Sequence, residues 1–446
     1  TFETKGKENN GATYGRRSDW QDLYSIAKKY YEALLADPGN ALFHLTDPRG
    51  ASDKSGRTFN NPYQYFFEQM HMDDAIYADE SIYEYPMQQG GGNDGRPYSF
   101  GRPSSGGSKA AYPCKSYGQG RINPAYFYGV FDPNDMRRDV SITMTGSNGK
   151  GVEKLIPFVP NSKAEGGGLT LNKWDENRQA NPWVAAQRKS GINGPYMRMS
   201  EVYLGYAEVC AALGDVVTGK QYLKTVRERS FPQGLANTDA FIASFGNDLV
   251  RAIIEERGFE YAGEGDRRWT LIRSGYLPED IKRIKDMTKA MMDGLATKGY
   301  YEFENGNIIS AYIWTKLVDA KTIYGHRLTA QCPTDKVNDP VLYPGWRGQK
   351  DNWEEMGLNY GSSTPATNLA IKGLFEIVSE EEAASLESQG YTKVNWGIDL
   401  VDNRDEYDKY LFWDYDYVSA PIYLWPFTPN VMAAGGFTNG YGFKQE

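Results

Sequence analysis

The most constraining feature of this chain is a pair of helix patterns that meet at one Gly–Asp turn. Apolar residues recur at spacings of three and four across residues 196–213, which places them on one face of a helix. That face carries Met199, Val202, Tyr203, Tyr206, Val209, Cys210 and Leu213. Gly214 and Asp215 end the pattern, and a second one follows with Leu223 and Val226 on its inner side. Two helices on so short a turn are the unit of a tetratricopeptide-like stack, although no repeat of about 34 residues accompanies them.

The same periodicity predicts further helices, separated by turn residues. The predicted helices cover residues 18–35, 62–70, 216–229, 239–269, 281–295 and 380–388. Much of the remaining chain is expected to be loop, because it contains 48 Gly residues and only short apolar runs. We therefore expect a mainly α fold, in which a tetratricopeptide-like scaffold carries long irregular loops and a few short strands.

The chain of 446 residues is expected to form a single unit with four segments. They are a helical segment at 18–90, a loop-rich insertion with a candidate ligand face at 91–195, the helix pair and following helix at 196–275, and a loop-rich C-terminal region at 276–446. Residues 132–145 are expected to form a turn and a short strand. The glycine-rich stretch 146–151 is expected to be a hairpin turn.

Aromatic residues are unusually common, at 14% of the chain with 33 Tyr. Residues 93–129 combine Gly, Pro, Ser and Tyr without a sustained helical or strand period. Loops of this length are usually functional or disordered, and disordered tracts are poor in aromatic residues. We therefore interpret this stretch as an ordered loop whose tyrosines have an apolar ring and a polar tip.

The net charge and the absence of common motifs disfavour several classes of function. The net charge of −9 and the pI near 5.2 disfavour nucleic-acid binding, and the longest apolar runs are far shorter than the ~18 residues of a membrane span. The three His residues are not spaced as metal ligands, and the usual hydrolase and phosphate-loop motifs are absent. A glycosidase needs only two carboxylates, and 58 acidic residues can always supply them, so a carbohydrate-active hydrolase stays as an alternative.

Two acidic clusters have competing interpretations. Residues 255–268 are the densest charge cluster, which we interpret as a partly buried ion-pair network at a helix end and not as an active site. Asp132, Asp135 and Asp139 are expected to form a turn in which Asp135 pairs with a following arginine, with calcium binding as the alternative. Cys210 is expected to be a small core residue, and the three Cys do not form a disulfide framework.

Several motifs together resemble the SusD/RagB family. Residues 196–208 read YMRMSEVYLGYAE, which is similar to the family's RxxEVYLxxAE helix, and LGD with YLKTVRER at 213–229 matches its second helix. Residues 253–265, IIEERGFEYAGEG, follow the family's next helical block, and 131–138, FDPNDMRR, resemble an upstream turn. The tail around Trp425 and Tyr441 is similar to the closing motifs. These motifs occur in the family's order from about residue 130 to the end.

The resemblance implies a nutrient-binding lipoprotein on the extracellular face of the outer membrane. Such a protein is not an enzyme, needs no cofactor and covers a SusC-like TonB-dependent transporter, for which it captures glycans or, as the alternative, peptides. The acylated cysteine and the usual N-terminal helices of the family are expected to lie outside this chain, so that its membrane contact would be only through an anchor that it does not contain.

Two aromatic groups are the candidate ligand contacts, because sugar sites combine aromatic faces with planar polar side chains. In the family the loops before the helix pair usually carry the ligand, which points to the first group. It comprises Tyr112, Tyr117, Asn123, Tyr126 and Tyr128. The second group comprises Trp346, Trp353 and Tyr360. For each single aromatic residue, packing against the body of the protein is the competing interpretation.

Overall fold

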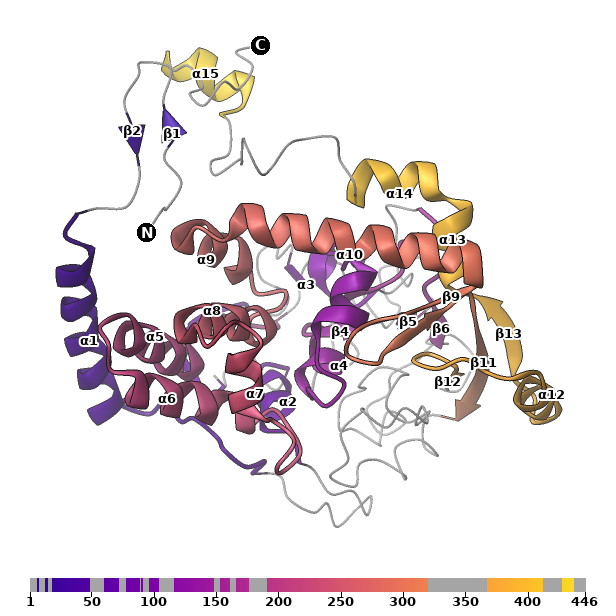
Figure 1. Ribbon diagram of the computed structural model, residues 1–446, viewed down its shortest axis with the longest axis horizontal. Helices are drawn as coiled ribbons and strands as arrows, with labels where there is room; N and C mark the ends of the chain where they lie inside the picture. The colour runs from indigo at the N-terminus through magenta and orange to yellow at the C-terminus, as the bar shows by residue number, and fades with distance from the viewer. Residues whose placement is uncertain are drawn as a thin grey trace.

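Helices dominate the computed structural model, and its strands are short (Figure 1). It describes residues 6–7, 13–14, 18–48, 60–71, 78–88, 90, 96–103, 116–147, 153–160, 166–175, 191–319, 367–411 and 427–436. The predicted fold class, a mainly α, tetratricopeptide-like scaffold with long irregular segments, is confirmed. Among the helices in these ranges, none is long and apolar enough to cross a membrane.

One part of the molecule is a layer of helices packed side by side (Figure 1). It contains α1 (Trp20–Ala36), α5 (Met199–Ala212), α6 (Val216–Glu228) and α8 (Leu249–Glu260). The predicted α5–α6 turn is present: Gly214 has φ +91°, which glycine adopts without strain, and the Asp215 side chain accepts a hydrogen bond from the backbone N–H of Thr218. Leu204 and Leu223 pack together in the core of this layer.

The first helix of the pair begins later than predicted. Tyr196 was expected inside the helix, but residues Gly194–Arg198 form strand β8, and α5 begins at Met199. β8 pairs antiparallel with β3 (Ser81–Tyr85), a strand far upstream in the chain. Local periodicity does not contain this long-range pairing, which overrides the helical pattern at its first turn.

The single helix predicted at 239–269 is three helices. They are α7 (Thr238–Ala243), α8 and α9 (Asp266–Ser274). Asn247, Gly263 and Gly265 have φ of 64°, 82° and 93°, a left-handed backbone that ends a right-handed helix. The apolar spacing continues through these breaks, and for that reason the pattern suggested one long helix.

A second core lies between α10 and the strands of the other half. α10 (Leu277–Lys298) has 22 residues and is longer than predicted, with Pro278 in its first turn. It packs beside a one-turn π-helix, η1 (Tyr126–Val130), and β9 (Tyr300–Glu302). A Cβ on Gly129 would come within 2.4 Å of the Phe303 ring, so glycine is needed where η1 meets the β9 hairpin. Fully buried side chains fill this core, among them Phe127, Tyr128, Ile313 and Trp396.

The strands form small antiparallel sheets. The pairs are β1 (Gly6–Lys7) with β2 (Thr13–Tyr14), β4 (Ile142–Thr143) with β7 (Thr170–Leu171), β5 (Thr145–Ser147) with β6 (Glu153–Leu155), and β9 with β10 (Ile308–Ser310). β11 (Tyr312–Asp319) lies between β12 (Thr367–Lys372) and β13 (Thr392–Asn395). The β5–β6 pairing agrees with the predicted hairpin, although Gly146 lies in β5 and residues 148–152 lie outside the described residues.

Seven shorter helices complete the described fold. They are α2 (Pro62–Gln69), α3 (Arg96–Phe100), α4 (Arg137–Ser141), α12 (Glu380–Ser388), α13 (Gly397–Asp402), α14 (Arg404–Leu411) and α15 (Pro429–Gly435). α2 and α12 were predicted. The sequence was wrong about residues 132–145, where α4 replaces part of the expected strand, and about the region past residue 390, where α13, α14 and α15 replace expected loops.

Candidate functional site

The charge cluster around Glu256 and Glu260 is buried, and both carboxylates form ion pairs. Both carboxylates project from one face of α8, one helical turn apart. Arg137 Nη1 lies 2.7 Å from Glu256 Oε1 and 3.0 Å from Glu260 Oε2, and Glu260 Oε1 also pairs with Arg229 Nη2 at 2.6 Å and with Arg198. Three guanidinium groups therefore meet one carboxylate. The predicted ion-pair network is confirmed, and it is more deeply buried than expected.

We call the connected set of ion pairs the buried charge network. Its acids are Glu80, Asp135, Glu256, Glu260 and Glu264, and its bases are Arg137, Lys173, Arg198, Arg227 and Arg229. Five acids face five bases, so the charges balance. The members come from the helix layer, from α4, from the start of β3, from the end of β8 and from the segment after β7. The network therefore connects distant parts of the chain.

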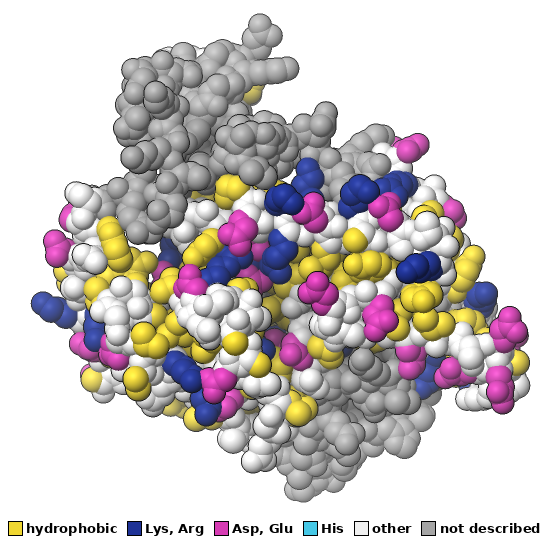
Figure 2. All heavy atoms as spheres, viewed as in Figure 1, with side chains coloured by type: hydrophobic (Ala, Val, Ile, Leu, Met, Phe, Trp, Pro, Cys, Tyr) yellow, Lys and Arg dark blue, Asp and Glu magenta, His cyan; other side chains and the backbone are white. Residues whose placement is uncertain are grey.

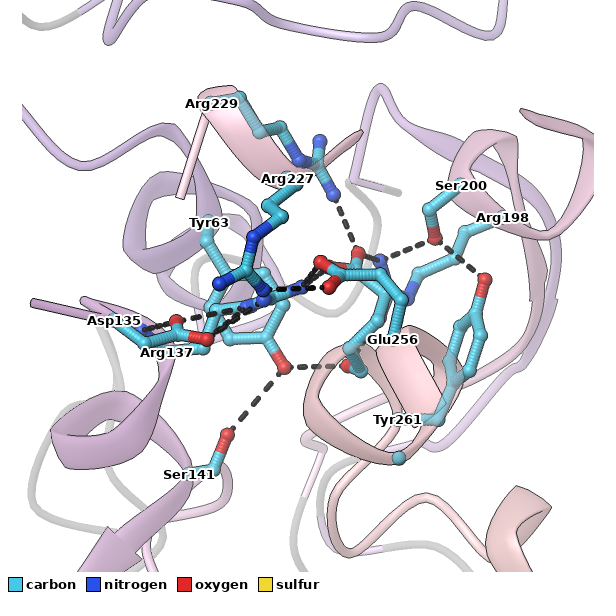
Figure 3. A network of polar contacts seen from close by, with 12 residues as sticks. Tyr63, Asp135, Arg137, Ser141, Arg198, Ser200, Arg227, Arg229, Glu256 and Tyr261 are labelled. Carbon is cyan, nitrogen blue, oxygen red and sulfur yellow. Dashed lines mark hydrogen bonds and ion pairs between the residues drawn. The ribbon is translucent and has the colours of Figure 1, made fainter. Parts of the chain in front are cut away.

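Hydroxyl groups complete the network (Figure 3). The Tyr63 hydroxyl donates to the backbone carbonyl of Glu260 at 2.6 Å. Ser200 Oγ accepts from Arg198 at 2.6 Å and lies 2.9 Å from the Tyr261 hydroxyl. These contacts satisfy polar groups that would otherwise lose their hydrogen bonds on burial. The arrangement is that of a rigid scaffold.

The pKa shifts in the network agree with a structural role. Burial opposes the charge on Glu260, yet Arg229, Arg198 and Arg137 hold the pKa of this carboxyl well below its usual range. Burial lowers the pKa of Lys173 to about 8, although Glu264 lies 2.7 Å away. A general acid would need a carboxyl that keeps its proton near neutral pH. Glu260 does the opposite, so it cannot protonate a leaving group.

The upstream acidic turn is also paired locally. Asp135 forms an ion pair with Arg137 at 2.7 Å, as predicted, and Asp139 pairs with Arg138 at 3.1 Å. Asp132 accepts a hydrogen bond from the backbone N–H of Asn134, which forms the turn. Within the described ranges no group of three acidic, His or Cys side chains could hold a metal ion. Calcium binding by this chain stays an untested alternative.

Asn123 and Tyr126, two candidate ligand contacts, are engaged within the body. Asn123 Nδ2 donates to Thr288 Oγ1 on α10 at 2.9 Å, and its Oδ1 accepts from the backbone N–H of Ala125 at 2.8 Å. The Tyr126 hydroxyl donates to the carbonyl of Gly258 on α8 at 2.8 Å. Both side chains therefore hold η1 in place, and ligand contact by either stays a prediction.

The prediction for Tyr128 was wrong, because this side chain is buried in the core and exposes no atoms to a ligand. It is 0% exposed, its hydroxyl accepts from Trp396 Nε1 at 2.8 Å, and its backbone carbonyl accepts from Asn305 and Asn307. Its ring also lies beside Phe375. A tyrosine followed by apolar residues looks the same in sequence whether its ring points to solvent or to the core. Burial decided between the two interpretations.

Tyr117 is partly exposed, as are Asn123 and Tyr126. The Tyr117 ring is half-buried and meets the Tyr98 ring edge to face, with the ring centroids 4.9 Å apart. Phe100, two residues after Tyr98, is 48% exposed. Ligand contact by Tyr117 stays a prediction. Four other candidates lie outside the described residues, namely Tyr112, Trp346, Trp353 and Tyr360.

A group of exposed, neighbouring aromatic side chains was missed. Tyr83 and Tyr85 on β3 are 55% and 54% exposed, and Tyr196 on β8 is 75% exposed. The sequence SIYEY, with tyrosines two residues apart, could have indicated a strand with one aromatic face. Tyr196 had been assigned to a helix, and so its position beside Tyr83 could not be foreseen.

Comparison with known proteins decides the family. A model described as the SusD family matches residues 43–426, most of the chain. The chain belongs to the SusD family. The SusD-like protein P25 of Formosa agariphila is 28% identical over 160 residues, which is 36% of this chain and 26% of that protein. The matched segment thus spans about a quarter of that relative.

Two solved structures are similar to this chain at lower identity. A SusD homologue from Bacteroides thetaiotaomicron is 18% identical, with a TM-score of 0.40 over 62% of this chain and 56% of that one. Surface glycan-binding protein A from the same organism is 18% identical, with a TM-score of 0.40 over 58% and 52% of the two chains. This chain therefore aligns with little more than half of either structure.

Three of the stretches that carry the SusD-family resemblance contribute residues to the buried charge network, whereas the tail motifs around Trp425 and Tyr441 lie outside the described residues. Arg198, Arg227, Arg229, Glu256 and Glu260 all come from the matched stretches at 196–208, 213–229 and 253–265. Their side chains face one another in the interior. The family motifs of this chain therefore describe a scaffold, and they do not by themselves specify what the surface binds.

Proposed function

We propose that this chain is the binding module of a non-catalytic surface protein that captures glycans for import. The observation that carries the proposal is the match to the SusD family across residues 43–426. The paired state of the network supports binding over hydrolysis, because its carboxylates are neutralised by arginine and lysine. Sugar capture needs aromatic faces and hydroxyl groups, and this chain exposes several tyrosines.

The finer parts of the proposal follow from the family. We propose that the protein works on the extracellular face of the outer membrane and is held there by a lipid anchor. Its partner is a SusC-like TonB-dependent transporter, which receives the captured ligand. Acidic and basic side chains are interspersed over the face drawn in Figure 2. That distribution supports a small or neutral ligand more than a nucleic acid, which would need a basic surface.

Calorimetric titration of the intact protein against neutral polysaccharides, oligosaccharides and peptides tests the proposal. We expect saturable heat with one class of glycan, and no new reducing ends after prolonged incubation. Heat only with peptides would replace the glycan by a peptide ligand on the same fold. Release of shorter sugars at a rate that depends on protein concentration would overturn the non-catalytic part of the proposal.

A further inference from the structure

We propose that the outer face of the β3–β8 ribbon binds neutral oligosaccharides directly. The inference rests on the proposed function and names a contact surface for it. We call Tyr83, Tyr85 and Tyr196 the tyrosine face. An exposed tyrosine is ordinary by itself, but three on one short ribbon form a shared aromatic surface.

The rings of the tyrosine face are held in a fixed relation. The centroids of Tyr83 and Tyr196 lie 5.4 Å apart with the ring planes at 86°, so that the edge of one ring meets the face of the other. Tyr83 and Tyr85 are two residues apart on one strand, which places them on the same side. The two paired rings are close enough together for one oligosaccharide to contact both of them.

Two β-bulges of opposite sense position the tyrosine face. Between the pairs Ser81–Arg198 and Tyr83–Met197, β3 has one additional residue, Ile82. Between Tyr83–Met197 and Glu84–Pro195, β8 has one additional residue, Tyr196. A bulge leaves its additional residue out of the ladder and redirects its side chain, and bulges are common beside functional sites. The second bulge accounts for the high exposure of Tyr196 and its position on Tyr83.

The ribbon is rigid, because its inner side is fixed by buried polar contacts. Glu84 accepts hydrogen bonds from the backbone N–H of Ala78, from Ser81 Oγ and from Asn193 Nδ2. Arg198, the last residue of β8, belongs to the buried charge network. Aromatic rings on a backbone that is already ordered lose little conformational entropy when a ligand arrives.

Charge identifies the occupant as a neutral sugar. The charged residues of the two strands, Glu84 and Arg198, are 4% and 1% exposed, so the charges of the ribbon lie on its buried side. The outer side presents tyrosine rings with hydroxyl tips beside Ile82. Such a face offers contact with sugar C–H groups and hydrogen bonds to sugar hydroxyls, and the two strands themselves expose no charged side chain that could pair with an acidic or basic peptide.

The test compares variants of exposed tyrosines in the intact protein. The double variant Tyr83→Ala/Tyr196→Ala is titrated with neutral hexasaccharides, laminarihexaose among them, beside the wild type. Tyr30→Ala is the matched control, because Tyr30 is 69% exposed on the outer side of α1. We expect the double variant to bind roughly tenfold or more weakly and the control to bind as the wild type does. Tyr196→Phe separates ring contact from the hydroxyl hydrogen bond, and we expect it to keep most of the affinity.

Hydrogen exchange with and without a saturating hexasaccharide gives an independent readout. We expect added protection at residues 81–85 and 194–198. If the double variant binds like the wild type, or if protection appears only elsewhere, the tyrosine face is not the contact surface and the proposed function stands. If the wild type binds no glycan, the proposed function fails and this inference fails with it.

Discussion

The β3–β8 ribbon separates two regions of opposite chemistry, the buried charge network and the exposed tyrosine face. On the inner side, carboxylates and guanidinium groups form ion pairs, at exposures of a few per cent. On the outer side, three tyrosines are more than half exposed and the strands present no charge of their own. At this ribbon, charged side chains lie in the interior, where they fix the geometry, and uncharged aromatic side chains face solvent.

This difference explains why the sequence indicates the family more clearly than it indicates the ligand. The charged motif residues need partners of matching charge and geometry, and a missing partner leaves an uncompensated buried charge. Exposed tyrosines have no such requirement, because removing one leaves no polar group unpaired inside the protein. Motifs consequently mark the network, and the binding face has to be found from the structure.

We expect the largest loss of stability when the carboxylate at the centre of the network is removed. Glu260→Gln keeps the shape of the side chain but leaves Arg137, Arg198 and Arg229 with one negative charge fewer in the interior. We expect the free energy of unfolding to fall by about 3 kcal/mol or more, or the folded state to be lost. Urea unfolding followed by circular dichroism measures the change.

A matched surface variant shows whether burial is the cause. Glu228→Gln removes a carboxylate that pairs with Lys224 at 3.5 Å, and its side chain is 53% exposed. We expect a change below about 0.5 kcal/mol for this exposed pair. Similar effects of the two substitutions would contradict the view that the network stabilises the fold through buried charge.

Alkaline pH probes the network through Lys173. Burial lowers its pKa to about 8 in the folded protein, whereas an exposed lysine has a pKa of about 10.4. Between these values the unfolded chain keeps a proton that the folded protein has released, so raising the pH stabilises the folded state through this group. We expect the wild type to gain on the order of 1–3 kcal/mol relative to Lys173→Met between pH 8 and 10. Equal pH profiles of the two proteins in denaturant unfolding would contradict the lowered pKa.

Helix existence was predictable from sequence, and helix boundaries were less so. Periodic apolar residues indicated α1, α2, α5 and α6, and a run of acidic residues indicated α12. The signal was clearest for α5 and α6, whose buried residues extend over several turns. The start of α5 was misplaced by the pairing of β8 with β3, which no local pattern contains. The breaks between α7, α8 and α9 depend on left-handed residues such as Asn247 and Gly263, whose conformation is set by tertiary packing.

The candidate site was less predictable, because it depends on which way single aromatic rings point. Tyr128 and Tyr83 are both tyrosines in short polar and apolar contexts, yet one is fully buried and the other is 55% exposed. The pairing of Asp135 with Arg137 was predictable, since the two residues are neighbours in the sequence. The contact of Tyr83 with Tyr196 was not, since it requires the register of two distant strands and both of their bulges.

Tyr128→Phe tests whether a buried tyrosine contributes to stability and not to ligand binding. The substitution removes the hydroxyl that accepts from Trp396 Nε1 at 2.8 Å and leaves a buried donor without its partner. We expect a loss of about 1–3 kcal/mol in the free energy of unfolding, with unchanged affinity for any glycan that the wild type binds. A weakened affinity at unchanged stability would restore Tyr128 as a ligand contact.

The smallest expected effect on stability belongs to the tyrosine face. Tyr83 and Tyr196 bury only part of their surface, and they contact each other at the edge of the molecule. Replacing either by Ala should therefore change the free energy of unfolding by no more than about 1 kcal/mol, the size of one exposed ring–ring contact. Thermal and urea unfolding of the single variants measure this. A loss as large as that expected for Glu260→Gln would mean that the rings hold the ribbon on the network, and the separation of a stabilising inner side from a binding outer side would then fail.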